Sequence, residues 1–379
     1  MRVEQIYEVM NTVTKEALGE ETVLQEDLSN IVEVGDTIQN VIGLDAFVRR
    51  LVDHIGRVIF VDRVYSGRTP SLLRDGWEYG SILEKISTGL PEATENESWE
   101  LQDGQSYDPN VFYQPQVTVK FYNDAVTFEI PISITEQQVK SSFSSVSQLN
   151  GFLSMIRNSI QNSMTVKTDE LIRRALNNFI SEVVNTNDGV TYVKLLTLYN
   201  ATLADGETPL TADDVMNGDK DAIKFIINKM YNYIDYLSVV SSRFNLGHQP
   251  RFTSKDRLNV IMLSAFKNAA SVYLDSDTFH EEYIALPQAE SVAYWQGSGD
   301  GFEFKDISNI NVKNSFGHTV NVDNVIAVMF DKDGVGVANQ DTHVTSNYNP
   351  KAEFWNEWTK AKMTLWNDQN ENFIVFALN

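Results

Sequence analysis

The residues that most often carry catalysis or bind metals are scattered through this chain of 379 residues. It has no cysteine, which excludes disulfides and thiolate chemistry. The histidines form no HExxH or other ligand spacing, so zinc is not expected; they are His54, His248, His280, His318 and His343. No GxSxG nucleophile elbow is present either. We predict no catalytic residue, no metal and no cofactor, and we expect that the chain is not an enzyme.

Two glycine-containing segments resemble ligand-binding loops without matching them. Gly297, Gly299 and Gly301 alternate as in a phosphate loop, but no GKS/T sequence and no obvious helix follows. Asp331–Gly334 begins like a calcium loop, but its glycine comes two positions early and Thr342 stands where a glutamate is needed. We therefore predict a simple turn at Asp331–Gly334, after a buried strand.

The chain is strongly acidic, with a formal net charge of −22. Nucleic-acid phosphates and anionic membranes repel such a chain. The charge fits either simple solubility or a container wall to which enclosed nucleic acid must not adhere. No window approaches the roughly 18 apolar residues of a membrane span. The start, MRVEQIYEVM, lacks the layout of a signal peptide. We expect a protein made in the cytoplasm and not associated with membranes.

The segment from Arg74 to Asp108 is an acidic, structure-poor excursion. It has nine acidic residues and two basic ones, mixed with Trp77, Tyr79, Trp99 and Tyr107. Disordered linkers are usually poor in aromatic residues, whereas interfaces are rich in them. The composition favours a loop that becomes ordered against a partner, and the alternative is a loop folded back on its own domain.

Regular elements follow this excursion. Val117–Tyr122 and Val126–Ile134 alternate as strands, and we expect them to pair as a hairpin that turns at Asn123 and Asp124. A helix is predicted from about Ser147 to Val184, because its apolar residues recur every three or four positions without glycine or proline after Gly151. Its exposed face carries Lys167, Arg173 and Arg174, which could meet the acidic excursion of a neighbouring copy.

The remaining residues predict a mixture of helices and strands. Before the excursion, we expect an N-terminal arm with helices in 1–42 and 44–55 and a strand at 57–64. After residue 190, we expect strands at Val190–Leu198, Leu258–Leu263, Asn324–Phe330 and Asn372–Leu378, and helices at Asp219–Phe244, Ala265–Val272 and Phe354–Lys362. The aromatic group Phe354, Trp355, Trp358 and Trp366 is interpreted as core.

The C-terminal third contains VIAVMFDKDGVGV and then NYNPKAEFWNEWTKAKMTLWNDQNENFIVFAL. With these segments, the order of elements resembles the major capsid proteins of tailed bacteriophages, most closely those of small short-tailed phages. The resemblance implies an α+β fold of the Hong Kong 97 type with an N-terminal arm, an extended loop, a long spine helix, a peripheral domain and an axial domain. The corresponding residues are 1–64 for the arm with the first helix and strand, 65–116 for the loop, 117–204 for the peripheral domain with the spine helix at 147–185, 205–345 for the axial domain, and 346–379 for a segment that returns to the peripheral domain.

The resemblance also implies a function and partners. Such a protein self-assembles from hexamers and pentamers into an icosahedral head that encloses double-stranded DNA without sequence-specific contact. It is assembled in the host cytoplasm with a scaffolding protein, meets a portal protein and can carry decoration proteins. Some family members join subunits through a lysine–asparagine isopeptide bond, but Lys85 has no alignable partner here and no bond is predicted. The candidate contacts between subunits are Trp77, Tyr79, Glu84, Glu95, Trp99, Lys167, Arg173 and Arg174.

Two alternatives remain open from the sequence. An encapsulin-like compartment would share the fold and enclose enzymes instead of DNA. A non-enzymatic acidic protein that binds a surface or a carbohydrate would use Trp77 and Trp99 to stack on sugar rings.

Overall fold

The computed structural model describes residues 11, 72–74, 83–89, 93, 96, 99, 102–114, 117–122, 125–138, 146–276, 289–296, 303–313 and 317–379. The chain divides into two compact units, each made of several stretches of sequence. Unit 1 comprises Met1–Ser81, Asp124–Arg174 and Val337–Leu365, and unit 2 comprises Ile82–Asn123, Ala175–Gly336 and Trp366–Asn379. Within the described ranges, none of the helices has the length and apolar character needed to cross a bilayer.

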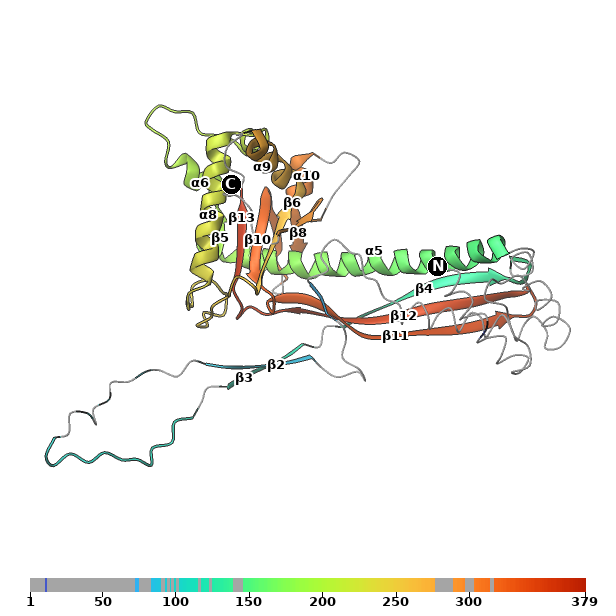
Figure 1. Cartoon of the computed structure of the whole chain (residues 1–379), viewed down its shortest axis with the longest axis horizontal. Helices are drawn as coiled ribbons and strands as arrows, with labels where there is room; N and C mark the ends of the chain where they lie inside the picture. The colour runs from blue at the N-terminus through green and yellow to red at the C-terminus, as the bar shows by residue number, and fades with distance from the viewer. Residues whose placement is uncertain are drawn as a thin grey trace. The chain divides into compact units, whose positions relative to one another are not determined.

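Unit 2 contains a five-stranded sheet in the order β5-β13-β10-β6-β7 (Figure 1). The strands are β5 (Tyr192–Lys194), β6 (Leu258–Leu263), β7 (Ala289–Val292), β10 (Val325–Asp331) and β13 (Phe373–Ala377). The central strand β10 runs antiparallel to both β13 and β6, and the outer pairs are parallel. Every residue of β10 is buried, which explains its continuous apolar sequence VIAVMF.

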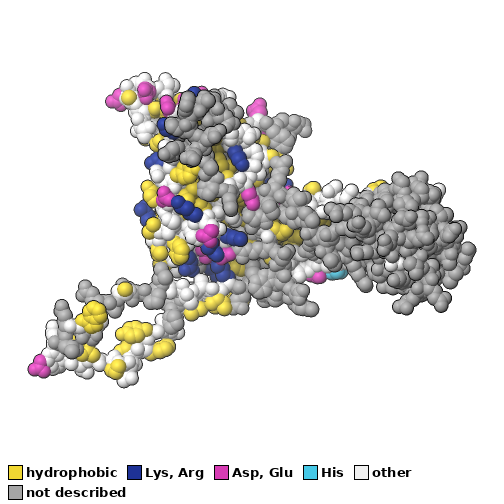
Figure 2. All heavy atoms as spheres, in the orientation of Figure 1, with side chains coloured by type: hydrophobic (Ala, Val, Ile, Leu, Met, Phe, Trp, Pro, Cys, Tyr) yellow, Lys and Arg dark blue, Asp and Glu magenta, His cyan; other side chains and the backbone are white. Residues whose placement is uncertain are grey.

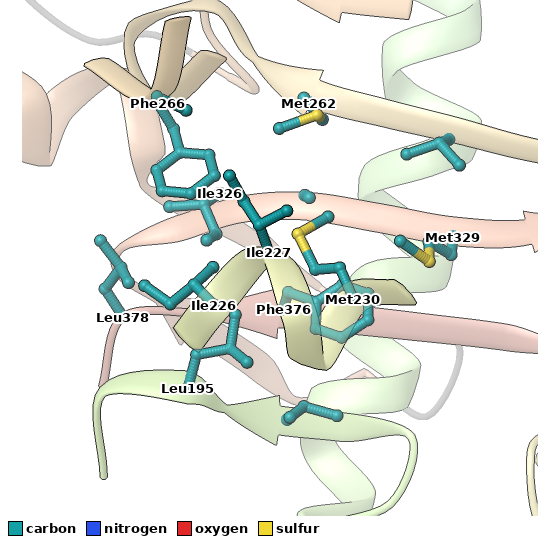
Figure 3. Packing of buried hydrophobic residues seen from close by; sticks show 14 of the residues in the cluster. Leu195, Ile226, Ile227, Met230, Met262, Phe266, Ile326, Met329, Phe376 and Leu378 are labelled. Atoms are coloured by element: carbon teal, nitrogen blue, oxygen red, sulfur yellow. The ribbon is translucent and has the colours of Figure 1, made fainter. Parts of the chain in front are cut away.

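Helix α8 (Lys220–Leu237) covers one face of this sheet, as Figure 3 shows. Asp219 caps its first turn, because the Asp219 Oδ1 atom accepts a hydrogen bond of 2.9 Å from the amide of Ala222. The face toward the sheet is a stripe at helical spacing that includes Ile223, Ile226, Ile227, Met230 and Ile234, all buried. It packs with residues of β10 and β13 into one apolar core.

Helix α5 (Val146–Thr186) is the longest element, with 41 residues. At 1.5 Å per residue it is about 60 Å long. Its residues up to Arg174 belong to unit 1, and those from Ala175 belong to unit 2. In unit 2, the ring of Phe179 lies 4.1 Å from that of Phe373 on β13, and Phe330 stacks on Phe373 at 5.3 Å. The C-terminal part of α5 therefore packs against the central sheet of unit 2.

Unit 1 contains a four-stranded sheet in the order β1-β11-β12-β4. The strands are β1 (Leu73–Arg74), β4 (Ala125–Thr135), β11 (Val335–Asn349) and β12 (Phe354–Asn367). Strands β4 and β12 are antiparallel over eleven residue pairs, from Phe354 opposite Thr135 to Thr364 opposite Ala125. Side chains of β12 alternate between buried and half-buried positions, as one covered face of a sheet requires.

Shorter elements complete the two units. A two-stranded ribbon joins β2 (Leu83–Thr88) to β3 (Val117–Tyr122), and a second ribbon joins β8 (Ile310–Lys313) to β9 (Thr319–Val322). The remaining helices are α6 (Leu195–Asn200), α7 (Ala212–Met216), α9 (Ser264–Ser276) and α10 (Phe304–Ser308).

Several predicted elements are confirmed. The long helix occurs as α5, within two residues of the predicted ends. The buried strands β6, β10 and β13 and the helix α9 occur where they were expected. Asp331–Gly334 forms the predicted turn, in which the amide of Gly334 donates to the Asp331 carbonyl at 2.7 Å. Trp355 and Trp366 are buried in the core as predicted, whereas Phe354 and Trp358 are only half-buried.

Other predictions were wrong. Strands β3 and β4 do not pair with each other, because β3 pairs with β2 and β4 pairs with β12. The excursion was expected to be structure-poor, yet it contains β2. The helix predicted at Phe354–Lys362 is part of β12, where Glu357 and Thr359 occupy buried positions and so hide the alternation of a strand.

Two element boundaries also need correction. The strand predicted at Val190–Leu198 ends at Lys194, where α6 begins. The helix expected to reach Phe244 ends at Leu237, whose carbonyl accepts a hydrogen bond of 2.7 Å from the Thr253 amide. The predicted N-terminal arm at 1–64 and the glycines of 297–301 lie outside the described residues, apart from Asn11, which is helical.

Candidate assembly site

The β2–β3 ribbon has two chemically different faces. In its antiparallel register, Lys85 is directly opposite Lys120 and Ile86 is directly opposite Val119. Residues directly opposite each other share a face, and neighbours along a strand alternate between faces. One face therefore carries Lys85, Lys120 and Tyr122, and the other carries Ile86, Val117, Val119 and Phe121.

The lysine face meets the turn between β12 and β13. The Lys85 Nζ atom lies 2.7 Å from Asp368 Oδ2 and 2.7 Å from Glu371 Oε1. The Lys120 Nζ atom lies 2.6 Å from Asp368 Oδ1. Asp368 is almost fully buried. Each of its two carboxylate oxygens forms an ion pair with a lysine of the ribbon. We call Lys85, Lys120, Asp368 and Glu371 the latch.

Backbone hydrogen bonds hold the acidic half of the latch in place. The amide of Asp368 donates to the Gly334 carbonyl at 2.7 Å, and the amide of Glu371 donates to the Asp368 carbonyl at 3.0 Å. Gly334 belongs to the turn between β10 and β11, so this turn supports the turn between β12 and β13. Arg251 adds a longer contact, with its Nε atom 3.7 Å from Glu371 Oε1.

The supporting turn is itself fixed by a buried carboxylate. Asp331 accepts hydrogen bonds from the Thr253 hydroxyl at 2.9 Å and from Arg257 at 3.1 Å. Arg257 also pairs with Asp333. Buried carboxylates are tolerated where such partners surround them, and these contacts connect the turn to the strand β10.

The contacts of the latch favour the charged forms of Lys85 and Asp368. Burial would lower the pKa of Lys85, but its hydrogen bonds to Asp368 and Glu371 outweigh burial and raise that pKa. Burial would raise the pKa of Asp368, but hydrogen bonds from Lys120 and Lys85 lower it below its ordinary value. Burial raises the pKa of Glu371, and Lys85 offsets only part of this effect. The short contacts of both lysines with Asp368 support a non-covalent anchor.

The opposite face of the ribbon is apolar and open to solvent. Phe121 is 60% exposed and Ile86 is 63% exposed, and Val117 and Val119 are also exposed. Contiguous exposed apolar side chains usually mark an interaction surface. A free two-stranded ribbon is only marginally stable, so a partner on this face would also stabilise the strands.

The connection between β2 and β3 continues this apolar character. Trp99 is 88% exposed, and Phe112 and Tyr113 are each 83% exposed. Figure 2 shows hydrophobic side chains along the loop that extends from the ribbon. Its described hydrogen bonds are local, such as that from the Asn110 amide to Asp108 at 2.9 Å. The loop therefore offers aromatic side chains of the kind that dominate binding energy at interfaces.

The predicted contact residues have different outcomes. Trp77, Tyr79 and Glu95 lie outside the described residues, and Glu84 is in β2 with its side chain outside them. Trp99 is exposed. Lys167 forms an ion pair of 2.8 Å with Glu170 of its own helix. Arg173 is half-buried and Arg174 is exposed. As contacts between copies, these residues remain predictions.

Sequence reasoning missed the latch and the exposure of the apolar face of the ribbon. The alternation of Val117, Val119 and Phe121 was visible, but alternation alone does not distinguish a core face from an interface. The latch had no local signal, because its lysines and carboxylates lie more than 240 residues apart in sequence.

The comparison with solved structures first identifies the fold, which is the Hong Kong 97-like fold of phage capsids. In a solved capsid structure of Staphylococcus phage Andhra, a chain matches this one with a TM-score of 0.51 and 10% sequence identity. The match covers 84% of this chain and 86% of that chain. At this identity the likeness shows the fold alone.

The family follows from the sequence. The sequence model of the Phi29-like phage major capsid proteins matches residues 10–377, and the chain belongs to this family. The major capsid protein of Bacillus phage GA-1 is 26% identical over 138 residues, which are 36% of this chain and 28% of that protein. The alignment thus spans less than a third of this relative. The family is one of structural proteins of the virion, and the matches support neither the encapsulin-like nor the carbohydrate-binding alternative.

Proposed function

We propose that many copies of this chain assemble into an icosahedral phage head around double-stranded DNA, and that the β2–β3 ribbon and its loop bind a neighbouring copy. The observation that carries the proposal is the open apolar face formed by Ile86, Val117, Val119 and Phe121. Its opposite face is already held by the latch. A ribbon anchored on one face and apolar on the other is suited to bridge two copies.

Burial of apolar side chains would supply the binding energy of this contact. Covering a large apolar side chain contributes about 1.5–3 kcal/mol relative to leaving it exposed. Four ribbon side chains and the aromatic residues of the loop would together offset the loss of freedom on association, which is several kcal/mol. In a closed shell each copy both gives and receives such a contact, so a modest contact is repeated around the whole shell.

The domain assignments belong to this proposal. We assign most of unit 1 to the peripheral domain, 205–345 with the strands β5 and β13 of the same sheet to the axial domain, and α5 to the spine. The same chain would form hexamers and pentamers by changing the angle of the loop beyond the ribbon and of the spine. A scaffolding protein, a portal protein and decoration proteins are the expected partners, with assembly in the host cytoplasm. The net charge of −22 suits an inner wall that does not bind the packaged DNA strongly.

Mutation of the ribbon face tests the proposal. We expect the double variant Ile86→Ser/Phe121→Ser to fold as a monomer and to form no shells when it is expressed with a scaffolding protein and viewed by electron microscopy. The matched control Ile86→Val/Phe121→Leu retains apolar side chains and should form shells. Normal shells from the serine variant would refute the role of the ribbon, and a wild-type chain that never assembles would refute the capsid proposal.

A further inference from the structure

We propose that the latch sets the direction in which the β2–β3 ribbon leaves its subunit, and so determines the geometry of the assembled product. This inference rests on the proposed function and adds positioning residues to it: Lys85, Lys120 and Asp368. The latch is separate from the proposed interface, because it lies on the face of the ribbon opposite the apolar one.

The chain connections do not explain where the ribbon is held. The residues before Ile82 and after Asn123 belong to unit 1, yet the ribbon groups with unit 2. Among the described contacts of the ribbon with unit 2, the short polar ones run from Lys85 and Lys120 to the turn after β12. The latch therefore attaches the ribbon to a unit other than the one its two ends enter.

The register of the ribbon places both lysines on the face that meets the anchor. Lys85 and Lys120 are directly opposite each other on one face. Like charges in this arrangement repel and destabilise a pair of strands. Asp368 lies between them, with one oxygen 2.7 Å from Lys85 and the other 2.6 Å from Lys120. A single carboxylate shared by two lysines fixes the ribbon against sliding, because a shift along the strands would move both lysines away from it.

The acidic half of the latch is rigidly supported. The Asp368 amide is bonded to Gly334, and Asp368 Oδ1 also accepts from the Asn370 amide at 3.0 Å. Gly334 follows Asp331, which is held by Thr253 and Arg257 at the end of the buried strand β10. A continuous series of short contacts thus connects the central sheet to the ribbon. Ribbon orientation is then inherited from the core of unit 2, and the apolar face points in one fixed direction.

The absence of cysteine in the wild-type chain allows a direct measurement of this orientation. Thr88→Cys at the end of β2 and Asn232→Cys on α8 place two spin labels on exposed positions of unit 2. In the full-length monomer, electron–electron double resonance should give a narrow distance distribution. Adding Asp368→Asn or Lys120→Met should broaden it, while Lys120→Arg should keep it narrow. An equally narrow distribution in all four proteins would overturn the proposal.

Assembly provides the second readout. We expect Asp368→Asn and Lys120→Met monomers that remain folded at the assay temperature to form open or irregular sheets in place of closed shells. Lys120→Arg and the control Lys255→Met, which breaks an exposed ion pair with Asp235, should form closed shells. A latch that only stabilises the fold would reduce the yield of shells and leave their diameter unchanged, and this result would also overturn the proposal. A wild-type chain that fails to assemble would refute the proposed function itself, whereas the spin-label distances would still report on the latch.

Discussion

Lys85 and Glu371 are separated by 286 positions in sequence, and their side chains form an ion pair of 2.7 Å. The contact joins the base of the extended loop to the turn before the last strand of the chain. Glu371 shares this turn with Asp368, which Lys85 also contacts. The loop of this capsid protein is therefore anchored by residues that lie close together only in the folded chain.

The two carboxylates of the latch should respond oppositely to mutation. The pKa of Asp368 is lowered because its lysines outweigh burial, so its contribution to stability is present above its ordinary pKa of 3.8 and is lost as the pH falls through the folded-state value. Burial raises the pKa of Glu371, so its ionisation opposes folding and this penalty is relieved as the pH falls. At neutral pH, Asp368→Asn should lower the free energy of unfolding by about 1–3 kcal/mol. Glu371→Gln should leave it unchanged or raise it by up to about 1 kcal/mol.

Urea unfolding at neutral pH and at about pH 3 measures both effects. The loss caused by Asp368→Asn should shrink at the lower pH, because below the ordinary pKa of 3.8 the unfolded chain takes up a proton that the folded carboxylate resists. Equal losses from both variants at neutral pH would contradict the opposite pKa shifts.

Alkaline pH should weaken the ribbon from the lysine side. Burial opposes the shift, but Asp368 and Glu371 raise the pKa of Lys85 above 10.5, and burial raises the pKa of Tyr122 above 10.0. A raised pKa in either group contributes stability that is complete below the unfolded-state pKa and is lost as the pH rises toward the folded-state value. The free energy of unfolding should therefore fall above about pH 10.

Lys85→Met and Tyr122→Phe should each make this alkaline decline shallower, as measured by denaturant unfolding at several pH values. Lys167→Met serves as the control, because Lys167 lies in an exposed pair with Glu170 and outside the latch. A decline that is equally steep in all three variants would show that the latch does not cause it.

The loop beyond the ribbon should be dispensable for folding and required for assembly. The outermost ribbon pair is Thr88 opposite Val117. Replacing residues 89–116 with Asn-Gly should close the two strands as a tight hairpin, because this dipeptide suits two-residue turns. We expect a folded monomer whose latch is intact and whose assembly is lost, because Trp99, Phe112 and Tyr113 are removed. Circular dichroism and electron microscopy check the two parts, and shells of normal size would contradict the role of the loop.

Two phenylalanines should separate folding from assembly. Phe330 is fully buried and stacks on Phe373, so Phe330→Ala should lower the free energy of unfolding by about 3–5 kcal/mol. Phe112 is 83% exposed in the loop, so Phe112→Ala should change it by less than about 0.5 kcal/mol and reduce shell formation. Denaturant unfolding and shell yield measure the two effects. A stability loss in Phe112→Ala similar to that in Phe330→Ala would show that the loop packs on its own subunit.

The sequence by itself determined the elements whose signal is local. The recurrence of apolar positions predicted α5, and the pattern of Asp219–Phe244 predicted α8, whose buried face carries Ile223, Ile227 and Met230. Continuous apolar runs predicted β6 and β10, and the Asp331–Gly334 turn followed from its own residues. In each case, the apolar residues that become buried lie close together in the sequence and form a recognisable pattern.

Only the tertiary structure decided which strands pair and what the loop is held by. The partner of β3 is β2, across a loop of 28 residues between Thr88 and Val117, although β4 follows β3 directly. Glu357 and Thr359 lie at buried positions of β12, so its side chains did not show the period of a strand. The lysines of the latch are favourable on one face only because Asp368 is brought between them. Strand pairing and the neutralisation of the two lysines depend on segments that are distant in sequence. No local pattern of residue types shows which distant segment will pack there.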